Sequence, residues 1–438
     1  MLAGDAICIL TRPAPRVPVE AFLALPLEGE RMLWDDGTGP HQSVDAWAFA
    51  GRGAAARVEA WGERRFSEAR DAAMRIFASL LDLGVSGAPK IRMFGGVSFQ
   101  PQGTAPPPWT GFADASFVLP RWTYCVSADA AFVRVAAPAN ELRGAEDRLA
   151  SVVRALEEAP LRPSAAPPNG ARVVEMERPV WDELVHDALR SIRKNELEKV
   201  VAARRSAVTL RTPIDLPAAL ARMRDLEPTC TRFALEREGG VFLGATPERL
   251  AVIRGLRVEV DALAGSIPRR DEDEVSDLVA SDKDQREHAL VVEGIRAALA
   301  PYCAEIEASS VPRVRTLRAV HHLWTPIHAK LRGPTHVLDL VGAVHPTPAV
   351  CGLPRESARG WIATHEPTPR GWYASPVGWL DADGEGQFAV AIRSALVKGT
   401  DAWLFAGAGI VEGSDAALEY RETSVKQTTM LATLGVSP

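Results

Sequence analysis

Several strand-like runs in this chain lie too close together along the sequence for helices to connect them. They occupy residues 233–238, 241–245, 249–253 and 258–263 in the middle of the chain, and residues 373–380, 388–397 and 402–405 near its end. Gly239-Gly240 is a typical hairpin signal between the first two runs, and polar turns at 381–386 and 398–400 separate the last three. A connection between parallel strands needs about a dozen residues or more, so strands this close pair antiparallel. The sequence therefore predicts large antiparallel sheets.

Amphipathic helices accompany these strands. Apolar residues recur at helical spacing in residues 63–83, 141–158, 178–194 and 281–299, with shorter helices at 337–344 and 354–365. Further strands are predicted at 92–100, 115–120, 122–126 and 199–210. Ser281 and Asp284 stand at the spacing of a capping box, which marks a helix start. Antiparallel sheets with helices packed outside define the α+β class.

The composition limits the kind of protein this can be. With 438 residues the chain is long enough for two or three domains, and residues 162–170, RPSAAPPNG, are its most linker-like stretch. A net charge of −6 argues against a surface that coats nucleic acid. Five scattered cysteines without a CxxC pair predict reduced thiols, the N-terminus lacks a basic signal-peptide region, and no apolar run approaches a membrane span. These features predict a cytoplasmic protein that binds neither nucleic acid nor membrane.

The segment 404–426 places charged residues beside very small ones. An apolar strand ends in the small residues 406–409, and a polar turn leads into a helix whose expected N-cap is Ser414 or Asp415. Three charged residues share one face of that helix, namely Glu419, Glu422 and Lys426. Such a group could hold a metal ion and an anionic ligand, and the same spacing also describes a solvated helix face.

Two more charged residues stand where a charge is unexpected. Glu287 leads the apolar stripe of the helix at 281–299, where a carboxylate is costly to bury unless it is paired or binds a metal. Arg393 shares one face of the strand at 388–397 with three alanines, which leave room for its guanidinium to clamp a carboxylate. Each residue also has an ordinary interpretation. Glu287 could lie at the solvent edge of the apolar stripe, and Arg393 could form a salt bridge at the edge of the sheet.

Lys199 and Glu248 are candidates for acid–base chemistry. Lys199 opens a nearly continuous apolar strand, and a lysine in such surroundings can serve as a base. Glu248 follows Thr246-Pro247 at a strand end, where a turn could aim its carboxyl group inward. A lysine at a strand start is more often exposed, and the signal at Glu248 is weak by itself. Small residues at 263–266 would let a ligand approach the backbone closely.

Together these segments resemble the chorismate-utilising enzymes, and among them the isochorismate synthases. The resemblance rests on the order of the blocks along the chain. They are KVVAARR (199–205), FLGATPERL (242–250), ALAGSIPR (262–269), SDKDQREHALVVEGI (281–295), VHHL (320–323), HPTPAVCG (345–352), RGWYASPVGW (370–379), FAVAIRSAL (388–396) and AGAGIVEGSDAALEYRETSVK (406–426). GGVSFQ and WTGFADASFVLPR in the N-terminal part are similar to the menaquinone-type members, so the resemblance spans the chain.

The resemblance implies a fold and a reaction. The family fold is one integrated unit with two large antiparallel sheets packed together, here residues 1–165 as the N-terminal half and 172–438 as the chorismate-binding catalytic region. This replaces the estimate of separate domains. The reaction implied is addition of water at C2 of chorismate with loss of the C4 hydroxyl, and it requires Mg2+. The partner implied is the small molecule chorismate, and we expect a monomer or weak homo-oligomer.

The resemblance also assigns roles to single residues. It implies Lys199 as the base that activates water and Glu248 as the acid that protonates the departing hydroxyl. It implies Glu287 and Glu422 as direct Mg2+ ligands and Glu419 as a ligand acting through water. The implied substrate contacts are Arg393, Tyr373, the Gly409 backbone, Ser266, His322, Ala349 and Lys426.

Three comparisons within the family favour isochorismate as the product. Anthranilate-forming relatives typically lack a lysine at the position of Lys199, aminodeoxychorismate-forming relatives carry a lysine at Ala264, and salicylate synthases tend to carry threonine at Ala349. His321 and Ser266 depart mildly from the usual glutamine and threonine. We expect menaquinone synthesis as the pathway. The alternatives are a salicylate-forming or siderophore-pathway enzyme and, from another class, a non-catalytic chorismate-binding protein.

Overall fold

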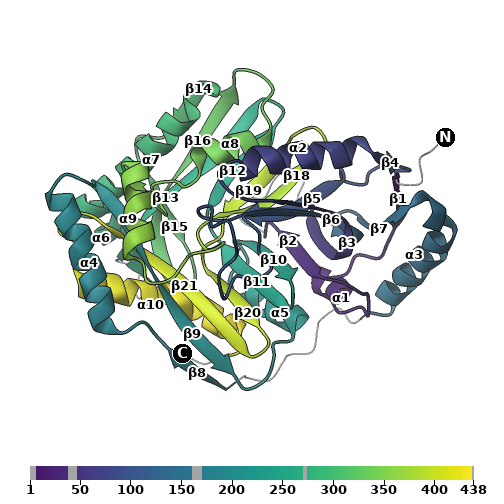
Figure 1. The fold of residues 1–438 in the computed structure, drawn as a ribbon, viewed down its shortest axis with the longest axis horizontal. Coiled ribbons are helices and arrows are strands. Elements are labelled where there is room, and N and C mark those ends of the chain that lie inside the picture. The colour runs from purple at the N-terminus through teal and green to yellow at the C-terminus, as the bar shows by residue number, and fades with distance from the viewer. Residues whose placement is uncertain (1–5, 38–46, 160–169, 270–273, 437–438) are drawn as a thin grey trace.

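The computed structural model describes residues 6–37, 47–159, 170–269 and 274–436. Over these residues, 21 strands join into one continuous curled sheet, in which β1–β4 is a parallel pair and the other strand pairs are antiparallel (Figure 1). Helices pack against the outside of this sheet. The α+β class that the short connections between strands predict is confirmed. The expected linker at residues 162–170 lies almost entirely outside the described residues.

The elements follow one another as the short turns predict. The N-terminal part contains β1 (Ile7–Pro13), α1 (Val19–Leu23), β2 (Arg31–Asp35), β3 (Ala48–Ala60), α2 (Arg65–Ala78), β4 (Leu80–Asp82), β5 (Arg92–Val97), β6 (Ala115–Val126), β7 (Ala131–Pro138), the short 3-10 helix η1 (Ala139–Glu141) and α3 (Leu142–Glu157). The middle contains β8 (Ala171–Val174), α4 (Arg178–Arg193), β9 (Lys199–Leu210), α5 (Leu216–Leu226), β10 (Thr231–Arg237), β11 (Gly240–Thr246), β12 (Arg249–Arg254), β13 (Arg257–Pro268), α6 (Glu274–Ala280) and α7 (Asp282–Leu299). The last part contains β14 (Cys303–Ala308), β15 (Arg313–Thr316), β16 (Val320–Leu331), α8 (Val337–Val344), β17 (Gly352–Leu353), α9 (Arg355–His365), β18 (Pro376–Asp381), β19 (Gly386–Val390), β20 (Ser394–Lys398), β21 (Asp401–Ile410) and α10 (Ala416–Thr433).

Strands of the N-terminal part pair directly with strands from the middle and the last part of the chain. β2 pairs with β10, and β5 pairs with β18, so the N-terminal strands continue the ladder of the later ones. Helix α7 packs on β13, while α10 packs along β21 and contacts α4 and α5. Figure 1 shows α4, α6, α7 and α9 together at one end of the view and α3 at the other. This arrangement brings the two helices that carry the candidate glutamates onto one region of the sheet.

Side-chain caps fix where those two helices begin. Ser281 Oγ accepts the backbone N–H of Asp284 at 3.2 Å, which confirms the predicted start of α7. Of the two expected caps of α10, Asp415 is the one used, because its Oδ1 accepts the N–H groups of Ala417 and Leu418 at 2.9 Å. Each cap satisfies N–H groups that have no partner within the helix.

Some predicted boundaries are wrong. The helix expected at 63–83 ends at Ala78, because the chain then enters β4 and pairs with β1. The two short strands expected at 115–120 and 122–126 are one strand, β6, whose partner β3 absorbs Pro120 through an irregularity between Ala54 and Ala56. Pro120 has no N–H to donate, so a local break in the ladder accommodates it.

The tight turns also differ from the expected ones. The hairpin between β10 and β11 turns at Glu238 and Gly239, with φ of 46° and 76°, rather than at the glycine pair. The strand expected at 388–397 breaks after Val390 and resumes at Ser394. Between them Arg393 has φ of 51°, the left-handed region. The predicted alternation of faces therefore does not extend to Arg393, and this break turns its side chain toward the site described below.

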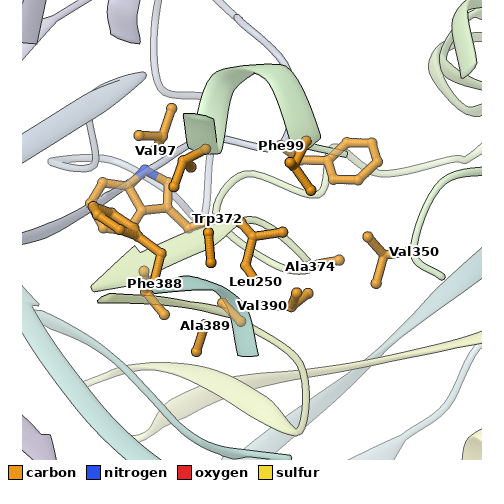
Figure 2. Packing of buried hydrophobic residues seen from close by; sticks show 14 of the residues in the cluster. Val97, Phe99, Leu250, Val350, Trp372, Ala374, Phe388, Ala389 and Val390 are labelled. Atoms are coloured by element: carbon orange, nitrogen blue, oxygen red, sulfur yellow. The ribbon is translucent and has the colours of Figure 1, made fainter. Parts of the chain in front are cut away.

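A buried apolar cluster lies beneath the sheet where both halves meet. Val97, the last residue of β5, and Phe99, in the connection to β6, belong to this cluster together with Trp372 and with Phe388 and Val390 of β19 (Figure 2). The indole N–H of Trp372 donates to the carbonyl of Ala113 at 2.9 Å, so the ring is satisfied as well as buried. This packing holds β18 and β19 firmly behind the site.

The five cysteines, residues 8, 125, 230, 303 and 351, are buried free thiols, as the sequence predicts. No helix in the described part of the chain is long and apolar enough to cross a membrane.

A buried ion cluster links α1 to strands β2 and β10, and it generates a stability prediction. Arg232 donates to Glu20 at 2.6 Å and also to Asp35, and its side chain is 2% exposed. We expect Arg232→Met to lower the free energy of unfolding by about 3–5 kcal/mol, since it removes the buried cation that Glu20 and Asp35 share. Urea unfolding measures this value.

The matched control is Arg224→Met. Arg224 also bonds Glu20, at 2.9 Å, but its side chain is 33% exposed, so we expect a loss of about 1 kcal/mol or less. Equal losses in the two variants would contradict the importance of the buried contact.

Candidate active site

A cavity opens where β9, β13, β21, α7 and α10 meet, and most of the predicted site residues line it. It encloses about 660 Å³ free of protein atoms, part of it open to solvent. Ten predicted residues form its wall, namely Glu248, Ser266, Glu287, His322, Ala349, Tyr373, Arg393, Gly409, Glu422 and Lys426. Lys199 and Glu419 are not in the wall. Each pairs with a residue on α7.

The β9–β21 ladder places Lys199 and Gly409 side by side. The two strands pair antiparallel, with Val201 opposite Gly409 and Val200 opposite Ile410. A Cβ atom on Gly409 would lie 2.2 Å from Glu287 Oε1 and 3.1 Å from Lys199 Cε. Glycine at this position therefore lets the Glu287 carboxylate rest against the strand backbone. The sequence predicts close approach here, and the group that approaches in this structure is Glu287.

Each of the three candidate metal ligands has a lysine partner. Lys199 Nζ lies 2.9 Å from Glu287 Oε1, Lys283 Nζ donates to Glu419 Oε1 at 2.7 Å, and Lys426 Nζ lies 2.5 Å from Glu422 Oε1. Lys426 also donates to the carbonyl of Gly407 at 2.9 Å, which links α10 to β21. Burial of Glu287 favours its neutral form, but Lys199 outweighs this effect and the net pKa of Glu287 is lowered.

The metal prediction is neither confirmed nor contradicted by this arrangement. In the described residues, no three His, Cys, Asp or Glu side chains are gathered closely enough to hold a metal ion. The donors nevertheless suit Mg2+, which prefers hard carboxylate oxygens. Burial and then the neighbouring Glu422 raise the pKa of Glu419, so the two α10 carboxylates are close enough to repel each other. Gly409 leaves space beside Glu287 Oε1. In this structure the cations that pair with the carboxylates are lysine ammonium groups.

Glu248 has the environment of a proton donor. It is 2% exposed, and its Oε1 has no hydrogen-bond partner among the described residues. Burial, and then the nearby Asp261 carboxylate, raise its pKa to about 8 against the opposing effect of Lys199. A carboxyl group with this pKa keeps its proton at neutral pH. Since Glu248 also lines the cavity, it can donate that proton to a bound molecule.

His322 joins Ser266 to Arg393 through its two ring nitrogens. Ser266 Oγ lies 2.7 Å from Nδ1, and Arg393 Nη2 lies 2.9 Å from Nε2. A guanidinium can only donate, so Nε2 accepts and the neutral ring carries its proton on Nδ1. Burial, followed by the charge of Arg393, holds the pKa of His322 well below its usual range. A neutral His322 thus orients Arg393 without adding positive charge.

Tyr373 and Arg393 supply polar atoms at the wall opposite α7. The Tyr373 ring stacks on Phe405 at 5.2 Å, and its hydroxyl lies near Gly407. The Arg393 guanidinium is buried, and burial lowers its pKa. A buried guanidinium without a close carboxylate of its own is suited to receive the carboxylate of a ligand. Among the contacts described for Arg393, the side-chain partner is neutral His322.

Three residues that support the site were not predicted from the sequence. Lys283, next to the α7 cap, pairs with Glu419, and its place one turn before Glu287 could have drawn attention. Asp261 lies behind Glu248 on β13, and nothing in the sequence links positions 248 and 261. Arg370 lines the cavity, but its guanidinium is engaged by Glu366 and by the carbonyls of Val201 and Val350 at 2.7 Å, so it supports the wall.

Comparison with known proteins shows the family to which this chain belongs. A model of the chorismate binding enzymes matches residues 5–435. The salicylate biosynthesis isochorismate synthase of Pseudomonas aeruginosa is 38% identical over 410 residues, which cover 91% of this chain and 85% of that protein. The isochorismate synthase MenF of Bacillus subtilis is 36% identical over 353 residues, which cover 78% of this chain and 74% of that protein. The chain belongs to the chorismate-binding enzyme family.

Solved structures agree with this assignment. The structure of MenF, the menaquinone-specific isochorismate synthase from Escherichia coli, matches with a TM-score of 0.78 at 28% identity, covering 99% of this chain and 96% of that one. Anthranilate synthase component I from Streptococcus pneumoniae matches with a TM-score of 0.71 at 21% identity, which shows the shared fold alone. The resemblance to isochorismate synthases that the sequence blocks indicate is confirmed.

The protonation of Glu248 can be tested through stability. Its pKa is about 8 in the folded protein against an ordinary value of 4.5, so between these pH values the unfolded chain releases a proton that the folded protein keeps. Wild-type stability therefore falls as pH rises through this window and levels off above it. We expect Glu248→Gln to lack this loss, so its stability relative to wild type rises by up to about 5 kcal/mol.

Urea unfolding of both proteins from pH 4 to pH 9 measures the difference. The control is Glu305→Gln, a glutamate on β14 whose side chain is 64% exposed. A constant difference between wild type and Glu248→Gln across the window would show that Glu248 ionises normally.

Proposed function

We propose that this chain is an Mg2+-dependent isochorismate synthase, which adds water at C2 of chorismate and expels the C4 hydroxyl. The observation that carries the proposal is the buried carboxyl group of Glu248, with a pKa of about 8, in a cavity that also presents Arg393 and Lys426. A dicarboxylate substrate needs cationic partners, and loss of a hydroxyl needs a proton donor. The isochorismate synthases among the relatives support the same reaction.

The cationic residues of the cavity would bind the substrate carboxylates. Arg393, oriented by His322, is placed to take one substrate carboxylate, with Tyr373 beside it. Glu287, Glu419 and Glu422 would hold Mg2+, which when bound supplies positive charge for a substrate carboxylate. The apolar wall at Ala349 and Val350 excludes water from the ring. These contacts fix the ring between the proton donor and the base.

The proton transfers are assigned to two residues. Glu248 gives its proton to the departing C4 oxygen, which leaves as water. Lys199, as the general base, takes a proton from the water that attacks C2. Its Nζ is held by Glu287 at 2.9 Å, so the base role requires this contact to be exchanged for one with water. The neutral state of Glu248 is favoured by its burial.

Incubation of the purified protein with chorismate and Mg2+, followed by chromatography of the products, tests the proposal. We expect isochorismate, and no turnover after treatment with a chelator. Salicylate with pyruvate as the main products would overturn the assignment in favour of a salicylate synthase. Chorismate binding without turnover would favour the non-catalytic alternative.

The pathway is a separate question from the reaction. Relatives named for salicylate biosynthesis and for menaquinone are similar to this chain at 38% and 28% identity, over 91% and 99% of its length. The menaquinone pathway therefore stays a prediction from the N-terminal blocks. Cytoplasmic location also stays a prediction, from the scattered cysteines and the lack of a signal-peptide region. Loss of menaquinone after deletion of the gene, restored by the gene on a plasmid, would support it.

The role of Lys199 gives a direct test. We expect Lys199→Ala to lower kcat by a factor of about 100 or more, because the base is removed. Chorismate binding in the presence of Mg2+ should remain measurable by calorimetry, since Arg393 and Lys426 are untouched. Lys330→Ala, whose side chain is 58% exposed on β16, is the control and should behave as wild type. Unchanged turnover in Lys199→Ala would exclude Lys199 from the mechanism.

The close approach at Gly409 gives a second test. Gly409→Ala introduces a Cβ 2.2 Å from Glu287 Oε1, so the carboxylate must move and its contact with Lys199 breaks. We expect a loss of kcat/KM of about a hundredfold with an unchanged circular dichroism spectrum. The control is Gly360→Ala on α9, where no atom lies within 4 Å of the new Cβ. Equal activity of the two variants would contradict the role given to Gly409.

A further inference from the structure

A second carboxylate, Asp261, is buried directly behind the proposed acid. Asp261 lies on β13, is 1% exposed and does not line the cavity. Nothing in the assigned chemistry uses it. A buried carboxylate is costly unless its surroundings compensate it, so its position beside Glu248 requires an explanation.

The contacts of Asp261 come from hydrogen-bond donors. Trp324 Nε1 donates to Oδ1 at 3.0 Å, and Arg249 Nη2 donates to the same oxygen at 3.4 Å. The backbone N–H of Arg249 donates to Oδ2 at 3.3 Å. A carboxylate that accepts from an indole, a guanidinium and a peptide group is stabilised in its ionised form.

These contacts also hold the main chain at Glu248. The N–H group of Arg249 belongs to the peptide bond that follows Glu248, so Asp261 is hydrogen-bonded to that peptide on one side. From the other side, the N–H of Val390 donates to the carbonyl of Glu248 at 3.0 Å. The backbone of the acid is thus fixed between β13 and β19, and its side chain is left to face the cavity.

We propose that Asp261 is a positioning residue for Glu248, holding its peptide and placing a second buried negative charge behind it, so that the proton stays on Glu248 until the substrate takes it. The inference rests on the proposed function. In the step concerned, the C4–O bond breaks with its electron pair on oxygen, the Glu248 proton moves to that oxygen, and water leaves. Glu248 becomes a carboxylate beside Asp261, and this repulsion favours its reprotonation from solvent.

The charges around Glu248 show why such a residue is needed. The groups that face it are Lys199 from β9, Arg315 from β15, Lys426 from α10 and Asp261 from β13. The three cations favour loss of the proton, and Asp261 is the negative charge that opposes them. Arg393 and neutral His322 line the same cavity. The cations that bind an anionic substrate would by themselves ionise the acid, and burial together with Asp261 prevents this.

The test is the pH dependence of kcat/KM, which reports the acid of the free enzyme. We expect activity of the wild type to fall above about pH 8, and Asp261→Asn to move this alkaline limb down by about one pH unit. The plateau at lower pH should change less than the limb. The matched control is Glu259→Gln, because Glu259 also bonds Arg249 from β13 but its side chain is 42% exposed. Its alkaline limb should match that of the wild type.

A second variant covers the case in which Asp261→Asn fails to fold because Arg249 loses its buried partner. Combining Asp261→Asn with Arg249→Met removes both charges, and we expect a smaller shift in the same direction. An alkaline limb that stays at the wild-type position in the variants that fold would overturn the proposal. A uniform loss of rate without any shift would reduce Asp261 to a structural residue and would overturn it equally.

An infrared titration separates this inference from the proposed function, since it needs no turnover. The carbonyl stretch of the protonated Glu248 is identified by its absence in Glu248→Gln. We expect this band to titrate at lower pH in Asp261→Asn than in the wild type. Failure to convert chorismate, with the band shifted as expected, would refute the reaction and leave the coupling of the two carboxylates supported. An unshifted band would refute the coupling whatever the reaction.

Discussion

The ion pair between Lys199 and Glu287 is the contact on which the site depends. Lys199 is completely buried, and Glu287 lies against the backbone of β21 where Gly409 leaves room for it. Either charge without the other would be strongly unfavourable in this position. The pair therefore fixes α7 against the β9–β21 ladder. The Lys283–Glu419 pair then fixes α10 against α7, and Lys426 bonds α10 back to the carbonyl of Gly407. The charges that the proposed reaction needs are the same charges that hold its helices together.

Helix caps and apolar packing also hold the cavity residues in place. Two of its helices are capped at their first turn by Ser281 and Asp415, so the carboxylates near those turns start from fixed positions. The apolar cluster of Figure 2 contains Trp372 together with Phe388 of β19, and Tyr373 and Ala374 of the cavity wall belong to the same cluster. Catalytic geometry must be held closely for proton transfer to be efficient, and both supports serve that end.

Much of this could be read from the sequence, and the failures have physical reasons. The strand β9, the helices α4, α7 and α8, and the antiparallel class follow from periodicity and short turns, because these are local properties. The residues around the cavity came from the order of the family blocks, and ten of them meet there. The ladder partners could not be found, because pairing such as β5 with β18 joins residues almost 300 positions apart. The left-handed turn at Arg393 was hidden inside a run that looks like continuous strand.

The two most important carboxyl groups show what sequence alone cannot decide. Glu248 is buried and the Glu287 side chain is 12% exposed, and burial by itself raises the pKa of each. Lys199 lies directly against Glu287, so that group is ionised and can serve as a cation ligand. Burial, and then the nearby Asp261, keep the proton on Glu248, so that group can serve as an acid. Two identical side chains thus differ in protonation because α7 brings Glu287 into contact with Lys199, whereas burial and Asp261 outweigh the cations that face Glu248.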